Sequence, residues 1–407
     1  MTSSTNNTQG RISSGSPRYH RVNLALFCAG FITFVTLYDV QPLLPLFTRE
    51  FGVSPAVGSL PLSISTFTLA VTMLLMGTVS ESIGRKPVMV TALIFTSLLA
   101  TLTSCSTTFP SLLAIRFIQG IVLAGVPSVA MAYLAEEMDA SAVASAMGLY
   151  ISGNAVGGMS GRVISAIMSD FMPWRTAIGL IGCLSLLLTL LFVKSLPPSA
   201  NFRTRPFEIR YLATSIIHHL RDPGMLLLFG IAFLCMGGFI SLYNYIGFRL
   251  LASPYSMSQS SISLIFLVYF FGSLSSAMMG RLIQRFGRRR LIRVMVFAML
   301  AGTFLTLSAA LPWIVAGVAL FTCGFFGVHT IASSWVGRRA ATAKAQAASL
   351  YLFFYYLGSS ISGTLGGFFW VQYAWSGITL MIAILLLLAL LCAELMSHFF
   401  SHQRPTF

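Results

Sequence analysis

Hydrophobic residues run along the chain in long blocks that are separated by short polar gaps. A helix needs about 20 mostly apolar residues to cross the ~30 Å hydrocarbon core of a bilayer, and twelve blocks reach that length. A spanning segment must satisfy its own backbone hydrogen bonds, so each block is predicted to be helical. The predicted spans are 22–46, 56–80, 88–107, 110–134, 142–168, 174–196, 224–250, 258–283, 290–309, 312–337, 343–370 and 374–398.

One longer polar segment divides this pattern six and six. The predicted organisation is a tail at 1–21, a six-helix bundle at 22–196, a linker at 197–223, a second six-helix bundle at 224–398 and a tail at 399–407. Within the linker, Pro206 to Arg221 could form an interfacial helix with basic residues on its polar side. The apolar side is expected to comprise Phe207, Tyr211, Leu212, Ile216 and Leu220.

The composition supports lipid as the solvent for most of the chain. Of the 407 residues, 56% are hydrophobic and 9% are charged, whereas a soluble protein carries about 25% charged residues. The six cysteines fall in separate apolar blocks without C-x-x-C spacing, so they predict neither a metal site nor a disulfide framework. A soluble enzyme and a disulfide-rich secreted domain are both excluded.

The formal net charge of +15 is spread over the polar gaps. A nucleic-acid-binding surface would gather the basic residues in one patch, so no nucleic-acid partner is predicted. Most of the 25 Lys and Arg fall in gaps on the same side as the N-terminus, whereas Arg49, Arg175 and Arg249 fall on the other side. By the positive-inside rule both termini are predicted to be cytoplasmic.

Three short patterns occur twice, in the same order and offset by about 200 residues. Thr36 to Asp39 matches Ser241 to Asn244; Gly77, Gly84 and Arg85 match Gly280, Gly287 and Arg288; Gly153, Gly158 and Gly161 match Gly358, Gly363 and Gly366. The halves are therefore predicted to be parallel, pseudo-symmetric repeats, an arrangement found in one large transporter fold.

Four motifs give the chain a specific resemblance. They are Gly77 to Lys86 after the second span, Arg116 to Gly120 in the fourth, Gly153 to Gly158 in the fifth and Tyr38 to Pro45 in the first. They resemble the twelve-helix drug and sugar efflux branch of the major facilitator superfamily, which includes the arabinose efflux permeases. The chain departs from the family pattern at Glu81, where aspartate is usual, and at Asn154, which replaces the proline of the antiporter motif.

Asp39 is the one acid among ten that lies well inside a predicted span. A charged aspartate there costs roughly 2.5–3.5 kcal/mol, so it should face the bundle interior or water and have a partner. Burial raises the pKa of a carboxyl group, and a nearby cation lowers it. Asp39 could therefore titrate between two conformations. The alternative is an acid near a helix end that reaches outer water.

Two arginines lie at a depth similar to that of Asp39 when the helical rise of 1.5 Å per residue is counted along each span. We expect Arg116 to form an ion pair with Asp39 that breaks on protonation, or else to bond to the backbone of the first helix. Arg162 is expected nearby or, more simply, to snorkel outward. Asn244 occupies the repeat position of Asp39 and cannot titrate, so proton coupling is expected in the first half.

The Gly77 to Lys86 motif has a mechanical interpretation. Gly77 would allow close helix contact and Gly84 a turn. The resemblance implies that Glu81 meets the start of helix 11 near Thr342 to Lys344, and that Arg85 meets Glu136 or Glu137 at the end of helix 4. In the alternative interpretation Arg85 and Lys86 are topology charges.

The resemblance also places the substrate cavity among helices 1, 4, 7 and 10, with parts of 5 and 11. Candidate cavity residues are Tyr38, Gln41, Asn154, Arg162, Tyr243, Asn244, Tyr245, His329, Trp335, Tyr355 and Tyr356. Aromatic side chains with a polar group suit amphipathic solutes, although they are also common at membrane interfaces. His329 could shuttle protons or be a hydrogen-bonded structural residue.

Together these features predict a secondary transporter of the bacterial inner membrane that works by alternating access. Its expected activity is proton-driven efflux of small organic compounds, drug-like or sugar-like, and its expected state is a monomer. No Walker-type phosphate-binding motif occurs, so the proton gradient is expected to supply the energy without a cofactor. Proton-coupled uptake and a non-transporting sensor are the alternatives, and an enzyme is not expected because no acid and base cluster is present.

Overall fold

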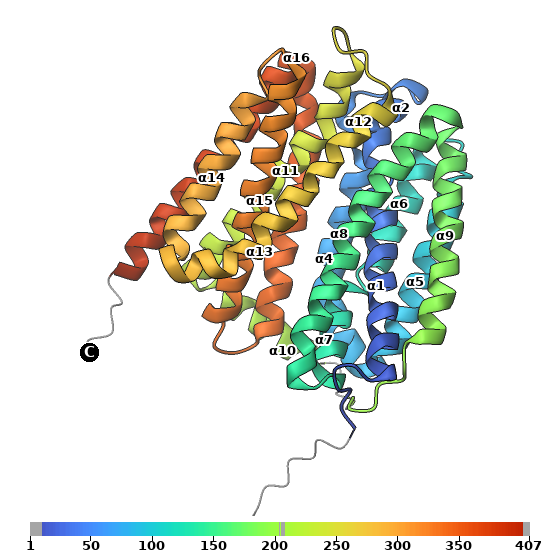
Figure 1. Ribbon diagram of the computed structural model, residues 1–407, viewed down its shortest axis with the longest axis vertical. Coiled ribbons are helices and arrows are strands. Elements are labelled where there is room, and N and C mark those ends of the chain that lie inside the picture. The colour runs from blue at the N-terminus through green and yellow to red at the C-terminus, as the bar shows by residue number, and fades with distance from the viewer. Residues whose placement is uncertain (1–9, 203, 205–207, 402–407) are drawn as a thin grey trace, which may run out of the picture.

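The computed structural model describes residues 10–202, 204 and 208–401, with side chains as far as Met396. Within these residues the fold is all-α, as predicted, and the β-structure amounts to one isolated bridge between Ile12 and Met138. Long helices run roughly parallel to one another over most of the molecule (Figure 1). In this part of the chain nine segments are long and apolar enough to cross a membrane.

The first half of the chain forms one group of helices. Its elements are α1 (Pro17–Tyr38), η1 (Gln41–Leu43), α2 (Leu44–Glu50), α3 (Pro55–Gly58), α4 (Leu60–Ile83), α5 (Arg85–Thr103), α6 (Phe109–Leu123), α7 (Pro127–Glu137), α8 (Ala140–Phe171) and α9 (Trp174–Ser195). Gly84 has φ of 111°, a conformation that favours glycine, and it allows the turn between α4 and α5.

The second half forms a corresponding group beside the first. Its elements are α10 (Ile209–Leu220), α11 (Pro223–Leu251), α12 (Gln259–Ser263), η2 (Leu264–Val268), α13 (Tyr269–Phe286), α14 (Arg288–Leu305), α15 (Leu311–Arg339) and α16 (Lys344–Ser401). The φ of 76° at Gly287, between α13 and α14, repeats the turn at Gly84. The two halves thus share their local geometry at the motif that the sequence repeats.

Several predicted spans are interrupted in the structure. The span predicted at 22–46 breaks after Tyr38, where Pro42 and Pro45 cannot supply the backbone N–H groups that a continuous helix needs. The span predicted at 110–134 breaks before Pro127 for the same reason. The spans predicted at 343–370 and 374–398 both fall within α16, and the loss of helical geometry at Tyr373 and Ala374 lies at the gap predicted between them.

The linker helix α10 is present, but its predicted apolar side is partly wrong. Its buried residues are Leu212, Ser215 and His219, whereas Tyr211 is 54% exposed. His219 Nε2 lies 3.1 Å from the carbonyl oxygen of Ala343, which ties α10 to the start of α16. Contact with the protein therefore decides the buried face, and that face is more polar than the sequence suggested. Phe207 lies outside the described residues.

Hydrogen bonds between the two halves lie at the end of the molecule that carries α2, α3 and α12 (Figure 1). Asp170 at the end of α8 accepts hydrogen bonds from the backbone N–H groups of Gln259 and Ser260 at 3.2 and 2.7 Å. Ser360 in α16 donates to the carbonyl oxygen of Ser63 at 2.7 Å. We call this end the contact end, and the opposite end, which carries α7 and α10, the far end.

Candidate transport site

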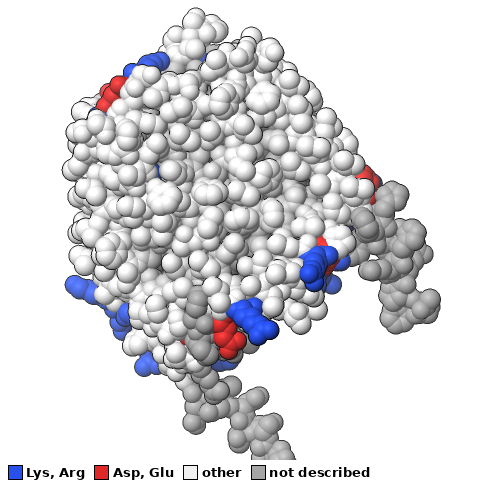
Figure 2. All heavy atoms as spheres, turned by 180° about the vertical axis from the view of Figure 1, so that it is seen from behind, with Lys and Arg blue, Asp and Glu red and all other residues white. Residues whose placement is uncertain are grey.

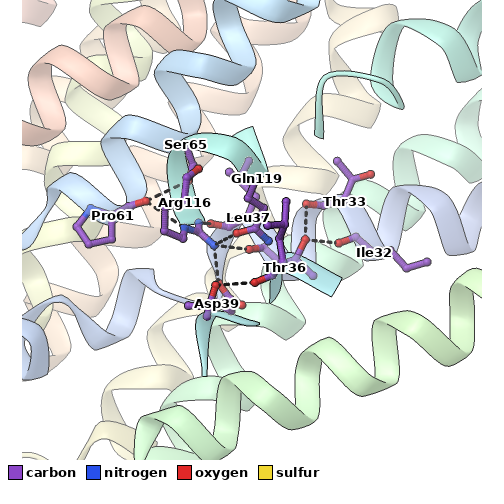
Figure 3. Close-up of polar contacts among 11 residues, drawn as sticks. Ile32, Thr33, Thr36, Leu37, Asp39, Pro61, Ser65, Arg116 and Gln119 are labelled. Atoms are coloured by element: carbon purple, nitrogen blue, oxygen red, sulfur yellow. Dashed lines mark hydrogen bonds and ion pairs between the residues drawn. The ribbon is translucent and has the colours of Figure 1, made fainter. Parts of the chain in front are cut away.

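Arg116 and Asp39 lie together inside the first group of helices, both 0% exposed. Arg116 Nη1 is 3.4 Å from Asp39 Oδ1, so the expected ion pair is present (Figure 3). The same guanidinium donates to the carbonyl oxygens of Thr36 at 2.9 Å and Leu37 at 2.7 Å. The two interpretations of Arg116, ion pair and backbone bond, therefore hold at once.

The break in the first span explains this position of Arg116. Because α1 ends at Tyr38, carbonyl groups in its last turn lack helical N–H partners. Arg116 satisfies two of them and places positive charge at the negative end of the helix dipole. Its Nε donates to Pro61 at 3.1 Å and its Nη1 to Gln119 Oε1 at 2.8 Å, which fixes the guanidinium relative to α4 and α6.

Asp39 is bound less completely than its partner. In the described part of the chain its second carboxylate oxygen, Oδ2, is buried and accepts no hydrogen bond. Buried polar atoms in native proteins almost always have partners, so an unpaired carboxylate oxygen needs an explanation. It is an atom that could accept a proton without displacing an existing bond.

Arg162 does not snorkel to the outer surface, and that expectation is wrong. Its side chain is 2% exposed and lies over the ring of Tyr38, 3.8 Å from the ring centre. Nε donates to Gln41 Oε1, and Nη1 donates to the carbonyl oxygen of Gly158 at 2.6 Å. Arg162 shares the face of α8 that carries Gly158 and packs on α1, so it points into the protein.

Gln41 connects Arg162 to the other half of the molecule. Its Nε2 donates to Oδ1 of Asn244 in α11 at 2.7 Å. The rings of Phe266 and Tyr269 also belong to the second half and lie within 5.6 and 5.0 Å of the Arg162 guanidinium. Tyr38, Gln41, Arg162 and Asn244 therefore form one group that spans both halves.

The other candidate cavity residues divide into those near this group and those in packing positions. Tyr243 donates or accepts a hydrogen bond with Thr322 at 2.7 Å and stacks on Phe266, 5.5 Å between ring centres. Tyr245 faces α16 instead, because its hydroxyl donates to Gly363 at 2.8 Å and its ring lies against Trp370. Asn154 packs against Gly30 where α8 crosses α1.

His329 lies in the second half, away from Asp39. Its Nδ1 is 3.0 Å from the Tyr351 hydroxyl, and its ring lies 4.9 Å from that of Tyr355. These contacts favour the structural interpretation of His329. Tyr355 packs edge-on against Tyr356, and Trp335 is half-buried in α15.

The Gly77 to Lys86 motif forms half of the expected contacts. Arg85 forms a bidentate ion pair with Glu136, in which Nη2 lies 2.7 Å from Oε1 and Nε lies 3.2 Å from Oε2. Glu137 instead accepts hydrogen bonds from Asn201 in the linker. Glu81 lies 3.7 Å from Arg85. Among the residues that the structure describes, Glu81 makes no hydrogen bond or ion pair with residues 342–344.

Asp222 makes an ion pair at the same end of the second half. Its carboxylate caps α11 through Gly224 and accepts two hydrogen bonds from Arg339, at 2.7 and 2.6 Å. Partial burial acts to raise the pKa of Asp222, but the hydrogen bonds and charge of Arg339, helped by the capped N–H groups, outweigh it and hold this pKa below its usual value. The pair therefore persists at neutral pH.

Comparison with known proteins decides the family. The family model for the Major Facilitator Superfamily matches residues 24–362 and 228–406. The chain belongs to this superfamily. It is 49% identical to the inner membrane transport protein YnfM of Escherichia coli (strain K12) over 93% of this chain and 91% of that protein. It is 47% identical to the uncharacterized MFS-type transporter YybF of Bacillus subtilis (strain 168), over 93% and 94% of the two chains.

The major facilitator fold is also evident in three dimensions. The nucleoside transporter NupG superposes with a TM-score of 0.76 over 92% of this chain and 99% of that chain, at 14% sequence identity. This likeness concerns the fold. The resemblance that the sequence motifs carried is confirmed, and relatives in this superfamily are named as transporters.

Some residues of this major facilitator site were missed in the sequence. Tyr269 and Phe266 belong to the span predicted at 258–283, which was not among the expected cavity helices, yet both contact Arg162. Asp170 lies between the spans predicted at 142–168 and 174–196 and was not a candidate site residue, but it bonds the start of α12 in the other half. No signal in a single sequence shows a contact between halves. An acid outside the spans and a serine-rich helix start in the other half are at most a weak indication of such a contact.

Proposed function

We propose that the protein is a secondary transporter that exports small organic compounds in exchange for protons, with Asp39 as the coupling acid. The observation that carries the proposal is the arrangement of Asp39. It is fully buried, it pairs with Arg116 through one oxygen, and its other oxygen has no partner in the described part of the chain. Buried acids inside membrane helices mark ion paths.

The position of Asp39 suggests how protonation would reach the contact between halves. Asp39 lies at the break of the first span, two residues before Gln41, which bonds both Arg162 and Asn244. Protonation would remove the attraction to Arg116, whereas the bonds of Arg116 to the α1 backbone would remain. The backbone between α1 and η1 could then rotate at Val40 and move Gln41. This movement would change the contact between the halves.

The proposed topology has twelve spans with both termini in the cytoplasm. In addition to the nine apolar segments of the described chain, α8 and α14 lie within the two groups of helices, and α16 is broken in its middle. Figure 2 shows Lys and Arg gathered toward the far end, with a broad uncharged band between the ends. This distribution supports a cytoplasmic far end.

One observation supports export over the other possibilities. The Tyr38 to Pro45 and Gly153 to Gly158 motifs resemble those of the efflux branch. The related YnfM is named an inner membrane transport protein, which supports an inner-membrane location. An inner-membrane location and a small-molecule substrate follow from the same proposal. Drug-like and sugar-like compounds are the substrate classes that the resemblance favours.

The test is proton flux in vesicles reconstituted with the full chain. A panel of amphipathic drugs, sugars and small organic acids is added, and the internal pH is followed with a trapped dye. Antiport moves protons against the substrate, whereas symport moves both in one direction, so the sign of the pH change reports the mode. Asp39→Asn is expected to abolish the proton movement and to leave substrate binding in place.

Glu394→Gln serves as the matched control, because it is also an acid-to-amide change. Glu394 forms an ion pair with Arg293, and both side chains are more than 40% exposed. This variant should behave like the wild type. Equal flux in the wild type and Asp39→Asn would place the coupling elsewhere and refute the role of Asp39. Flux of substrate without proton movement would refute proton coupling itself.

A further inference from the structure

Arg162 is a buried cation without a carboxylate partner in the part of the chain that the structure describes. Its side chain is 2% exposed, and Asp39, the acid of the nearby first span, is paired with Arg116. The groups that hold Arg162 are neutral, namely the Gln41 amide, the Gly158 carbonyl and the Tyr38 ring. An uncompensated charge is costly to bury, so its presence here calls for a function.

One end of the guanidinium is still available. Apart from its contacts with the Tyr38 side chain, the guanidinium of Arg162 bonds within the described chain through Nε, which donates to Gln41, and Nη1, which donates to Gly158. A guanidinium recognises carboxylates through its planar N–H groups. Nη2 is therefore a donor that a ligand could use while the two existing bonds keep the side chain oriented.

The neighbouring amides are oriented by Arg162. Arginine only donates, so the Gln41 atom facing Nε must be its oxygen, and the Gln41 nitrogen must then face Asn244. Asn244 accepts with Oδ1, which leaves its Nδ2 as a buried donor without a partner. This chain of bonds shows that the free atom of Asn244 is a donor.

A second unpaired donor belongs to a residue that lines the same recess as Asn244. Gln259 Nε2 is buried without an acceptor, and Gln259, Gln41, Asn244 and Phe266 line one recess between the halves. Asn244 is 2% exposed and Gln259 6% exposed, so these donors are shielded from bulk water. Arg162 does not line this recess itself but adjoins it through Gln41 and Phe266. The unpaired donors and the uncompensated cation together lack a negatively charged acceptor.

The surroundings of Arg162 define the remainder of the ligand. The rings of Tyr38, Phe266 and Tyr269 surround the guanidinium at 3.8 to 5.6 Å from their centres. An acidic group bound to Arg162 would thus place its organic body among aromatic side chains. These rings favour a compact apolar or aromatic body over a heavily hydroxylated one.

We infer that Arg162, Asn244 and Gln259 form a recognition site for the carboxylate of a monovalent organic anion, so that the exported compounds are small apolar or aromatic acids. This inference rests on the proposed transport function and specifies its substrate class. Because the site spans both halves, the ligand would bridge them. The recess has a volume of about 10 Å³ in this conformation, so the ligand would bind where the halves are slightly further apart and still joined at the contact end.

Three probes of similar size and different charge test this inference. Phenylacetate, phenylacetamide and phenethylammonium are titrated into the purified full chain in lipid nanodiscs, and binding is followed by calorimetry. Phenylacetate is expected to bind at least about tenfold tighter than the neutral amide, because an arginine that binds a buried carboxylate contributes more than that factor. Phenethylammonium should bind most weakly. Equal binding of all three probes would overturn the inference.

Three variants locate the binding. Arg162→Gln should remove the preference for phenylacetate, and Arg162→Lys should keep part of it, because the charge remains without the planar fork. Asn244→Asp is nearly the same size and brings a carboxylate to the site, so it should raise the melting temperature and abolish phenylacetate binding. Preference for the anion that survives in Arg162→Gln and Asn244→Asp would refute the assignment.

The inference and the proposed function fail in different ways. Arg162-dependent phenylacetate binding without any proton flux in vesicles would refute proton-coupled transport and leave the anion site standing. Proton flux triggered equally by neutral and cationic compounds, with no anion preference, would refute the anion site and leave the transport function standing.

Discussion

At the scale of single residues, Arg116 combines two roles that are usually separate. It neutralises Asp39, and it satisfies the free carbonyl groups of Thr36 and Leu37 at the end of α1. The bonds to the carbonyl groups are shorter than the contact with the carboxylate. Arg116 is therefore expected to hold the helix end whether Asp39 is charged or neutral.

This arrangement predicts the stability of Arg116 variants. Arg116→Gln should destabilise the protein by about 3–5 kcal/mol, because it leaves a buried carboxylate without its cation. Adding Asp39→Asn should recover part of that loss, and the remainder reports the lost bonds to the α1 backbone. The measurement is thermal unfolding of the two single variants and the double variant in one detergent. Full recovery would show that the backbone bonds contribute nothing.

The sequence predicted residue contacts correctly where they depend on the depth of a residue along its helix. It failed where they depend on the face of the helix from which the side chain points. Asp39 and Arg116 could be paired because they lie at similar depths in helices that come together. Arg162 was misjudged because its depth near the outer side suggested snorkelling. Its position next to Gly161 and four residues after Gly158 indicates the face packed against α1, and that periodicity could have corrected the prediction.

At the scale of helices, glycine determines how closely α1 and α8 approach. A side chain at Gly153, Gly157 or Gly161 would collide with the α1 backbone at Phe27, Phe31 or Val35. The second half repeats the arrangement, because a side chain at Gly358 in α16 would collide with the backbone of Phe233 in α11. The close crossing is thus a common feature of the two repeats, and small residues make such crossings possible in membranes.

The crossing predicts opposite effects for two alanine substitutions in α8. Gly157→Ala should destabilise the protein by about 1–3 kcal/mol, because the added methyl group overpacks the contact with Phe31. Gly148→Ala is the control, since no atom lies within 4 Å of its new methyl group. It should be neutral or slightly stabilising because alanine favours the helix more than glycine does. Similar melting temperatures for both variants would contradict the packing role.

Helix boundaries were predictable where proline, a turn-forming glycine or a gap in the apolar pattern marks them. Pro42 and Pro127 each accompany a break inside a predicted span, and both breaks could have been read from the sequence. The break at Tyr373 and Ala374 has no proline, but it lies at the gap between the spans predicted at 343–370 and 374–398. The 3-10 segment η2 has no proline or gap that marks it in the sequence. Its geometry depends on tertiary contacts, which hydropathy does not describe.

At the scale of the whole molecule, the two halves are joined at one end. In the described chain the hydrogen bonds between the halves include those of Gln41 with Asn244, Asp170 with the start of α12, and Ser360 with Ser63. At the far end Glu81 pairs with Arg85 and not with the start of α16. With a cytoplasmic far end, as proposed above, this conformation is closed to the outside.

Alternating access then predicts that the contact between Glu81 and the start of α16 forms when the contact end opens. In a background without native cysteines, Glu81→Cys with Lys344→Cys should form a cross-link slowly. Adding Asp170→Ala removes the acceptor of two backbone hydrogen bonds at α12 and should accelerate the cross-link. The measurement is the rate of disulfide formation with a mild oxidant.

The control for this experiment is Glu394→Ala, which removes an exposed acid within the second half and should leave the rate unchanged. A ligand that bridges the halves at Arg162 should oppose Asp170→Ala, because it adds contacts across the closed end. Phenylacetate should therefore slow the cross-link in the Asp170→Ala protein. If Asp170→Ala left the rate unchanged, the bonds at α12 would not control the equilibrium, and opening would depend on Gln41 and Asn244.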